Sequence, residues 1–133
     1  MLNFPQRMKV RIMGERSVTA VSEWQALQEL PMPTLASAKD AGAVYSVLKV
    51  AFVWIDLSEC RDANLPAEPI ADGKCALASI LVDGEGRREL YRLPLSLSDW
   101  AFSEVTLARQ GLRKYPSEIE FGCLSDRHYA EIL

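Results

Sequence analysis

The most apolar run of the sequence, Ala41 to Leu57, constrains the fold more than any other stretch of the chain. Lys49 stands in the middle of this run and Asp56 near its end. No uncharged stretch therefore approaches the ~20 residues that a membrane-spanning helix needs. We expect the run to be buried inside a folded domain, where it must form either a helix or a strand.

The spacing of apolar residues in this run favours a helix. Five of them recur at i, i+3, i+4, i+7 and i+11: Val44, Val47, Leu48, Ala51 and Ile55. That spacing is typical of one helix face, and buried strands rarely exceed ~8 residues. The β-branched residues of the run count against a helix, because they lose side-chain freedom there. We predict a long central helix from about Leu35 to about Asp56, capped by Ser37 with Asp40 and ended before Pro66.

Length and composition are typical of a single folded domain over residues 1–133. The hydrophobic content of 49% and the three tryptophans indicate a packed core. A net charge of −3 gives no basic footprint, so we expect no nucleic-acid partner. The N-terminus lacks an apolar signal segment. Cys60, Cys75 and Cys123 are widely spaced and odd in number, which fits reduced thiols. We therefore expect a cytoplasmic protein.

Three elements are predicted before the central run: a strand over residues 8–13, a returning strand over 17–21 and a short helix over 23–30. Ser22 and Gln25 have the spacing of a capping box for this helix, which would bury Trp24 and Leu27. After the run, residues 58–73 form a long acidic loop, and loops of this length are often functional.

The clearest local pattern is a β-hairpin over residues 76–95. Apolar residues alternate on both sides of a turn that runs from Asp83 to Gly86 and contains two glycines. The second strand of this hairpin places Arg88 and Arg92 on the same face, because side chains two and four residues apart share a side of a strand.

The remaining elements are a helix over 99–110 ended by Gly111, a strand over 118–124 and a short C-terminal helix over 126–133. In the strand, Ile119, Phe121 and Cys123 would face the core. The predicted fold class is α+β in the order β-β-α-α-β-β-α-β-α. We expect a mostly antiparallel sheet that packs one face on the long central helix.

Charge is unevenly distributed along the chain. Residues 84–114 carry six basic and four acidic side chains, whereas residues 54–73 carry five acidic and one basic. Arg88 and Arg92 could together grip a carboxylate through bidentate hydrogen bonds, although the same pattern fits an ordinary solvated strand face. Arg109 and Arg113 extend the basic region. Trp54 lies off the main apolar stripe, where it can anchor a partner. The candidate binding residues are Arg88, Arg92, Trp54, Arg109 and Arg113.

Cys123, Asp126 and His128 supply a thiol, a carboxylate and an imidazole, which are the parts of a cysteine–histidine nucleophilic site. The alternative is a small buried thiol and a surface histidine, because Cys123 is predicted to face the core and His128 to lie on the next turn or helix. No close cysteine pair indicates a zinc site, and the glycine turn at 84–86 lacks the following helix of a phosphate loop. We expect no metal and no cofactor.

These patterns predict a small non-enzymatic protein-binding or regulatory protein, such as an inhibitor, an adaptor or an immunity-type module. The expected partner is another protein, and a second copy of the chain in a homodimer is one candidate. The alternative is a small enzyme or a binder of anions and carboxylates that uses Arg88 with Arg92, or Cys123 with His128. A structural component of a larger assembly is a third possibility.

Overall fold

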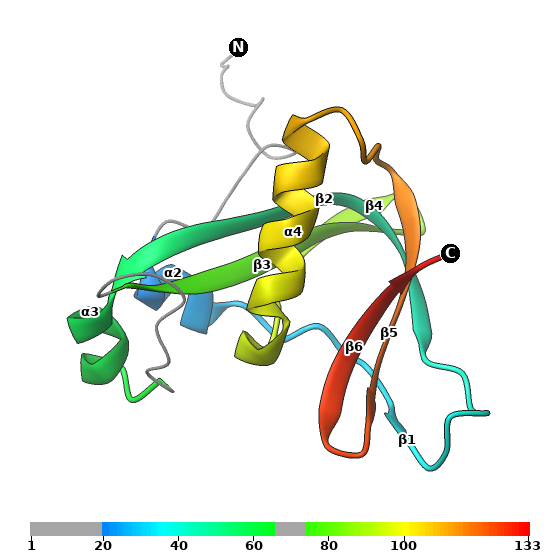
Figure 1. Ribbon diagram of the computed structural model, residues 1–133, viewed down its shortest axis with the longest axis horizontal. Coiled ribbons are helices and arrows are strands. Elements are labelled where there is room, and N and C mark those ends of the chain that lie inside the picture. Colours follow the sequence, from blue (N-terminus) through cyan, green and yellow to red (C-terminus); the bar gives the residue numbers. More distant parts are fainter. Residues whose placement is uncertain (1–19, 66–73) are drawn as a thin grey trace.

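The structure is a computed structural model that describes residues 20–65 and 74–133 (Figure 1). Its elements are α2 (Val21–Ala26), β1 (Thr34–Leu35), β2 (Ala43–Asp56), α3 (Leu57–Asp62), β3 (Lys74–Gly84), β4 (Arg87–Arg92), the 3₁₀ helix η1 (Leu95–Leu97), α4 (Ser98–Arg109), β5 (Ser117–Leu124) and β6 (Arg127–Ile132). The predicted strand over 8–13, residues 17–19 of the next strand and residues 66–73 of the acidic loop lie outside the described residues. The described part is α+β, as predicted.

The six described strands form one mixed sheet in the order β1-β5-β2-β3-β4, with β6 paired to β5. Only the β1–β5 pair is parallel, so the sheet is mostly antiparallel. Residues 43–47 of β2 pair with β5, whereas residues 46–56 pair with β3. The long, bent β2 therefore joins the β3–β4 hairpin to the β5–β6 hairpin, as Figure 1 shows.

The predicted long central helix over about 35–56 is wrong, because residues 43–56 form the 14-residue strand β2 and residues 36–42 form no helix. The register of β2 against β3 shifts between Val47 and Lys49, which marks a β-bulge. Val47 before the bulge and Val50 after it both face the same core, whereas Ile55 faces another. A bulge adds one residue to a strand and so changes which alternate positions face inward. The helix-like spacing of three comes from this extra residue and from burial on both faces.

Two hydrophobic cores lie on opposite faces of the β2–β3 pair. The first core contains Ala78 and Ile80 of β3 and lies under α4, which crosses β2 and β3 (Figure 1). The second contains Leu77 and lies against α2 and α3, where Trp24 is buried as predicted. Residues 76–82 of β3 are all buried, because both faces of the strand are covered.

Three local predictions are confirmed: the β3–β4 hairpin, α4 and the strand β5. Gly111 follows α4 with φ of +76°, the left-handed conformation expected after a helix end. Ile119 and Phe121 of β5 are fully buried. Helix α2 is shorter than predicted and begins after Ala20 without a side-chain cap, so the capping box of Ser22 does not form.

The predicted C-terminal helix over 126–133 is wrong, because residues 127–132 form β6. Ser125 and Asp126 make a two-residue turn between β5 and β6, and both have positive φ. This is the geometry of a type I′ hairpin turn, which usually carries Asn-Gly. Ser37 and Asp40 likewise form a turn rather than a helix cap, because the Asp40 carboxylate accepts hydrogen bonds from the N–H groups of Ala36 and Ser37.

Candidate functional site

Arg92 is engaged within the fold. Its Nη1 donates hydrogen bonds of 2.9 Å to the carbonyl oxygens of Gln25 and Leu27, at the C-terminal end of α2. Its guanidinium carbon lies 5.2 Å from the centre of the Trp24 ring. A cation is favoured both at a helix C-terminus and over an indole face. Arg88 shares this side of β4, as the strand periodicity predicts, but is exposed to solvent.

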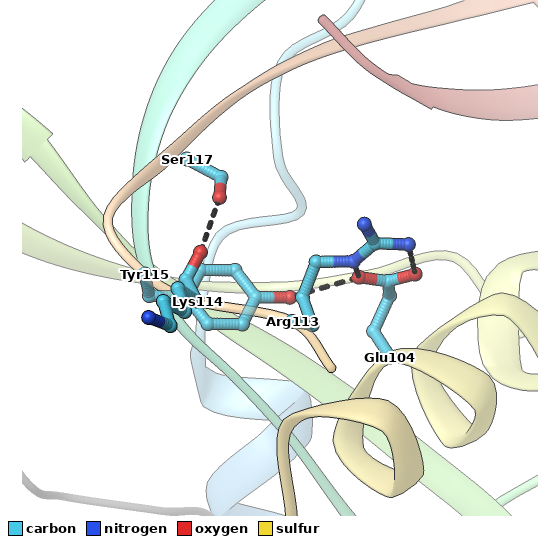
Figure 2. A network of polar contacts seen from close by, with 5 residues as sticks. All are labelled: Glu104, Arg113, Lys114, Tyr115 and Ser117. Carbon is cyan, nitrogen blue, oxygen red and sulfur yellow. Dashed lines mark hydrogen bonds and ion pairs between the residues drawn. The ribbon is translucent and has the colours of Figure 1, made fainter. Parts of the chain in front are cut away.

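Arg113 is also engaged, in a network with Glu104 of α4 and Tyr115 (Figure 2). Its Nε and Nη2 donate to the two carboxylate oxygens of Glu104 at 2.7 and 3.3 Å. The Tyr115 hydroxyl donates to the same carboxylate at 3.1 Å. Burial and the nearby carboxylate raise the pKa of Tyr115. The network therefore ties α4 to the segment that leads into β5.

Glu104 is only 4% exposed and was not a candidate from the sequence, although the chain contains a signal for it. It lies three residues after Ala101 and four before Ala108, both on the apolar side of α4. A charged residue at such a position needs a partner when it is buried. The sequence could have flagged Glu104 in this way, but not its partners, which lie beyond the helix.

A pocket of about 370 Å³ opens between β2 and α4. Six of its lining residues are apolar: Leu48, Val50, Ala51, Phe52, Val105 and Ala108. Lys49, Arg109 and Tyr115 complete the lining. The pocket thus lies at the bulge of β2, and the Glu104 network fixes Tyr115 in its wall. Arg109 is exposed, and its guanidinium has no ion-pair partner among the residues that the structure describes.

An aromatic cluster continues from this pocket. Phe52 makes edge-to-face contacts with Trp54 and Phe102, at ring-centre distances of 5.4 and 5.2 Å. Trp54 and Phe102 also contact each other at 5.9 Å. Phe102, on α4, remains 41% exposed and was not singled out by the sequence. Because Phe52 belongs to both the pocket and the cluster, the two form one surface, called here the β2–α4 surface.

The structure brings Cys123 and His128 together. They are directly opposed across the β5–β6 hairpin, so the prediction that His128 lies on a turn or helix is wrong. Leu133 N–H donates to the carbonyl of Glu118, and this sets the alternation so that Cys123 and His128 form a non-hydrogen-bonded pair. Side chains in such pairs lie close together on one face. Ser96 of η1, which the sequence did not indicate, lies 2.8 Å from His128 Nδ1 through its hydroxyl oxygen.

The cysteines differ from the predicted pattern of reduced thiols. Cys60 of α3 is fully buried and disulfide-bonded, so the prediction is wrong for this residue. Cys123 is a free thiol and is half-buried. Disulfides persist mainly in oxidising compartments, so the cysteines no longer argue for the cytoplasm. The cytoplasmic location stays a prediction.

Two further features bear on the kind of site. Among residues 20–65 and 74–133, no group of three or more His, Cys, Asp or Glu side chains is placed to hold a metal ion. Within the same residues, no helix combines the length and the apolarity required to cross a bilayer.

Comparisons of the chain with protein-family models, with curated proteins and with solved structures find no match. No relative therefore supplies a site or an activity for this chain, and its function has to be inferred from its own residues.

Proposed function

We propose that this protein is a non-enzymatic binding module that recognises another protein through the β2–α4 surface. The observation that carries the proposal is the joining of an apolar pocket to a partly exposed aromatic cluster across two elements of the fold. Arg88 and Arg92, a candidate binding pair from the sequence, support this role less well, because Arg92 is engaged with α2.

The size and lining of the pocket support binding of a side chain. A volume of about 370 Å³ lies in the lower part of the ~300–1,000 Å³ range of small-ligand sites. It can accept one or two apolar side chains of a partner segment. Beside it, Trp54 and Phe102 offer the aromatic side chains that are enriched at protein interfaces and often dominate their binding energy.

The chemistry of the lining supports binding rather than catalysis. Proton transfer and nucleophilic attack most often use histidine, carboxylate, cysteine or serine side chains. None of these lines the pocket, whose polar side chains are those of Lys49, Arg109 and Tyr115. The raised pKa of Tyr115 keeps its phenol protonated, and the hydroxyl is already used by Glu104.

Selection of a random peptide library on the immobilised protein tests this proposal. Peptides rich in apolar residues should be enriched, and Phe102→Ser should weaken their binding by about tenfold or more. Leu112→Ser is the matched control, because Leu112 is 68% exposed and lies outside the surface. If no peptide is enriched, or if Phe102→Ser binds as tightly as Leu112→Ser, the β2–α4 surface is not a protein-binding site.

A second candidate function, chemistry at the Cys123 thiol, is favoured by one observation. Cys123 lies opposite His128 across the hairpin, and Ser96 contacts the Nδ1 of that imidazole, so a nucleophile, a base and an orienting group belong to neighbouring positions. The test is the rate of alkylation of Cys123 by iodoacetamide as a function of pH. His128→Gln should slow the reaction by about tenfold near neutral pH. An unchanged rate would show that His128 does not activate the Cys123 thiol.

A further inference from the structure

We infer that the β2–α4 surface selects a partner segment in which a carboxylate stands next to an apolar side chain, and that Arg109 is the residue that reads the carboxylate. This inference rests on the proposed function and adds the chemistry of the occupant. An apolar pocket alone would accept many peptide sequences. An arginine at a fixed position beside the pocket restricts binding to those that carry an acidic group.

The side chains that line the pocket include cations but no carboxylate. The whole chain carries a net charge of −3, yet the residues around the pocket include two cations and no carboxylate. A site lined by one sign of charge beside apolar walls attracts the opposite sign, because the walls exclude water and weaken screening. Arg109 therefore places an exposed positive charge beside apolar walls in a protein whose net charge is negative.

Arg109 is the exposed cation of this lining. It follows the apolar residues Val105 and Ala108 along α4, so an apolar wall and a guanidinium come from one rigid element. Its side chain is exposed and has no ion pair within the described chain. A guanidinium can bind a carboxylate through two parallel hydrogen bonds, which fixes the orientation of the acid. Arg109 is therefore free to do for a ligand what Arg113 does for Glu104.

The Arg113–Glu104 ion pair holds Tyr115 beside the pocket. Because Arg113 holds both oxygens of Glu104, this buried carboxylate is neutralised within the fold. It does not compete for Arg109, and it holds Tyr115 in the lining. The site thus keeps its shape when empty, which lowers the entropic cost of binding.

A pair of small probes tests the inference directly. We would titrate the protein with 3-phenylpropionate and with 3-phenylpropionamide, which have nearly the same shape but differ in charge, and follow backbone amide NMR signals. The carboxylate should shift signals of residues that line the pocket and bind at least about fivefold more tightly than the amide. Arg109→Gln should remove this preference, and Arg88→Gln, which neutralises an exposed arginine of β4, should leave it unchanged.

The peptides selected on the protein provide the second test. Replacing their acidic residue by its amide should weaken binding about tenfold to the wild-type protein but not to Arg109→Gln, because the two changes remove the same interaction. Peptides that bind equally well without the acid, together with equal affinity for the two probes, would overturn the inference and leave the proposed function standing. If Phe102→Ser weakens the binding of none of the peptides, the proposed function itself is wrong. If occupancy of the surface instead depends on self-association of the protein, the occupant is a second copy of the chain. The inference of an acidic partner segment would then be wrong.

Discussion

Arg92 and Arg109 each lie near the end of a helix and beside apolar side chains, yet the fold engages only Arg92. Arg92 sits over the Trp24 ring, where the carbonyls of Gln25 and Leu27 converge at the end of α2. Arg109 sits beside apolar lining at the end of α4, and no described side chain pairs with it. The difference lies in the acceptors and not in the residue type. An arginine whose acceptors come from its own chain stabilises the fold, whereas one without them is available to a ligand.

The largest expected effect is at the junction of α2 and β4. Arg92→Ala removes two hydrogen bonds from a charged donor and leaves two carbonyls without their partner. We expect a loss of about 3 kcal/mol in the free energy of unfolding, from ~1.5 kcal/mol or more for each such bond. Urea denaturation measures it, with Arg88→Ala as the exposed control. Equal stability of the two variants would contradict the distinction between engaged and free arginines.

The next effect is at the network that closes the pocket. Glu104→Ala leaves the Tyr115 hydroxyl and the Arg113 guanidinium without their shared acceptor. Because Glu104 is 4% exposed and the lost bonds are charge-assisted, we expect about 2 kcal/mol of destabilisation. Glu118→Ala, at an exposed position, is the matched control for urea denaturation.

The same Glu104 variant also tests the pocket. Loss of the network should lower the pKa of Tyr115 toward its ordinary value of 10.0, because the neighbouring carboxylate is gone. An ultraviolet titration of the variant checks this shift. If Tyr115 titrates as in the wild-type protein, burial alone sets its pKa, and the network does not define the pocket wall.

The success of sequence reasoning differed sharply between β3–β4 and β2. In the hairpin, turn residues and alternation agree, and Asp83 even accepts a hydrogen bond from Gly86 N–H within the turn. In β2, the bulge between Val47 and Lys49 and the burial of both faces remove the alternation that identifies a strand. The β-branched residues of this run indicated a strand correctly, because such side chains are favoured in strands: Val44, Val47, Val50, Val53 and Ile55. They were outweighed by a spacing that a bulge can imitate.

The candidate site was predicted only in its parts. Arg109 and Trp54 do lie on one surface, and Cys123 does lie opposite His128, but no sequence pattern indicated that Arg109 and Phe52 line the same pocket. Such neighbours are made by packing between elements far apart in the chain. Partners that are main-chain carbonyls, as for Arg92, carry no sequence pattern at all.

A smaller, pH-dependent effect is expected at Glu120, a half-buried carboxylate that accepts two hydrogen bonds. Glu120 accepts hydrogen bonds from the Tyr129 hydroxyl at 2.5 Å and from Gly42 N–H at 3.0 Å, and these two bonds lower the pKa of Glu120. A lowered pKa contributes stability that is complete above the unfolded value of 4.5 and is lost as the pH falls through the folded pKa. The bond to Glu120 also raises the pKa of Tyr129 to about 12.

Comparison of urea unfolding at about pH 7 and about pH 3 measures this effect. Glu120→Gln should lose less stability on acidification than the wild-type protein, because the glutamine does not titrate. Glu131→Gln, on the exposed part of the neighbouring strand β6, serves as the control. An identical loss in the wild-type protein and Glu120→Gln would mean that the bonds to Tyr129 and Gly42 do not favour the ionised acid.

The smallest expected effect on stability, at Arg109, is the most informative for the comparison. Arg109→Ala removes no ion pair within the described chain and opens no buried space, so the free energy of unfolding should change by less than ~0.5 kcal/mol. The same variant should lose the preference for a carboxylate over its amide. Arg92→Ala, examined under conditions where it is still folded, should keep that preference. The effects of the two variants would then be distinct: Arg92→Ala would change the stability of the fold, and Arg109→Ala would change ligand binding. A marked destabilisation by Arg109→Ala would show instead that Arg109 stabilises the fold. The β2–α4 surface would then have no free arginine to bind an acidic group.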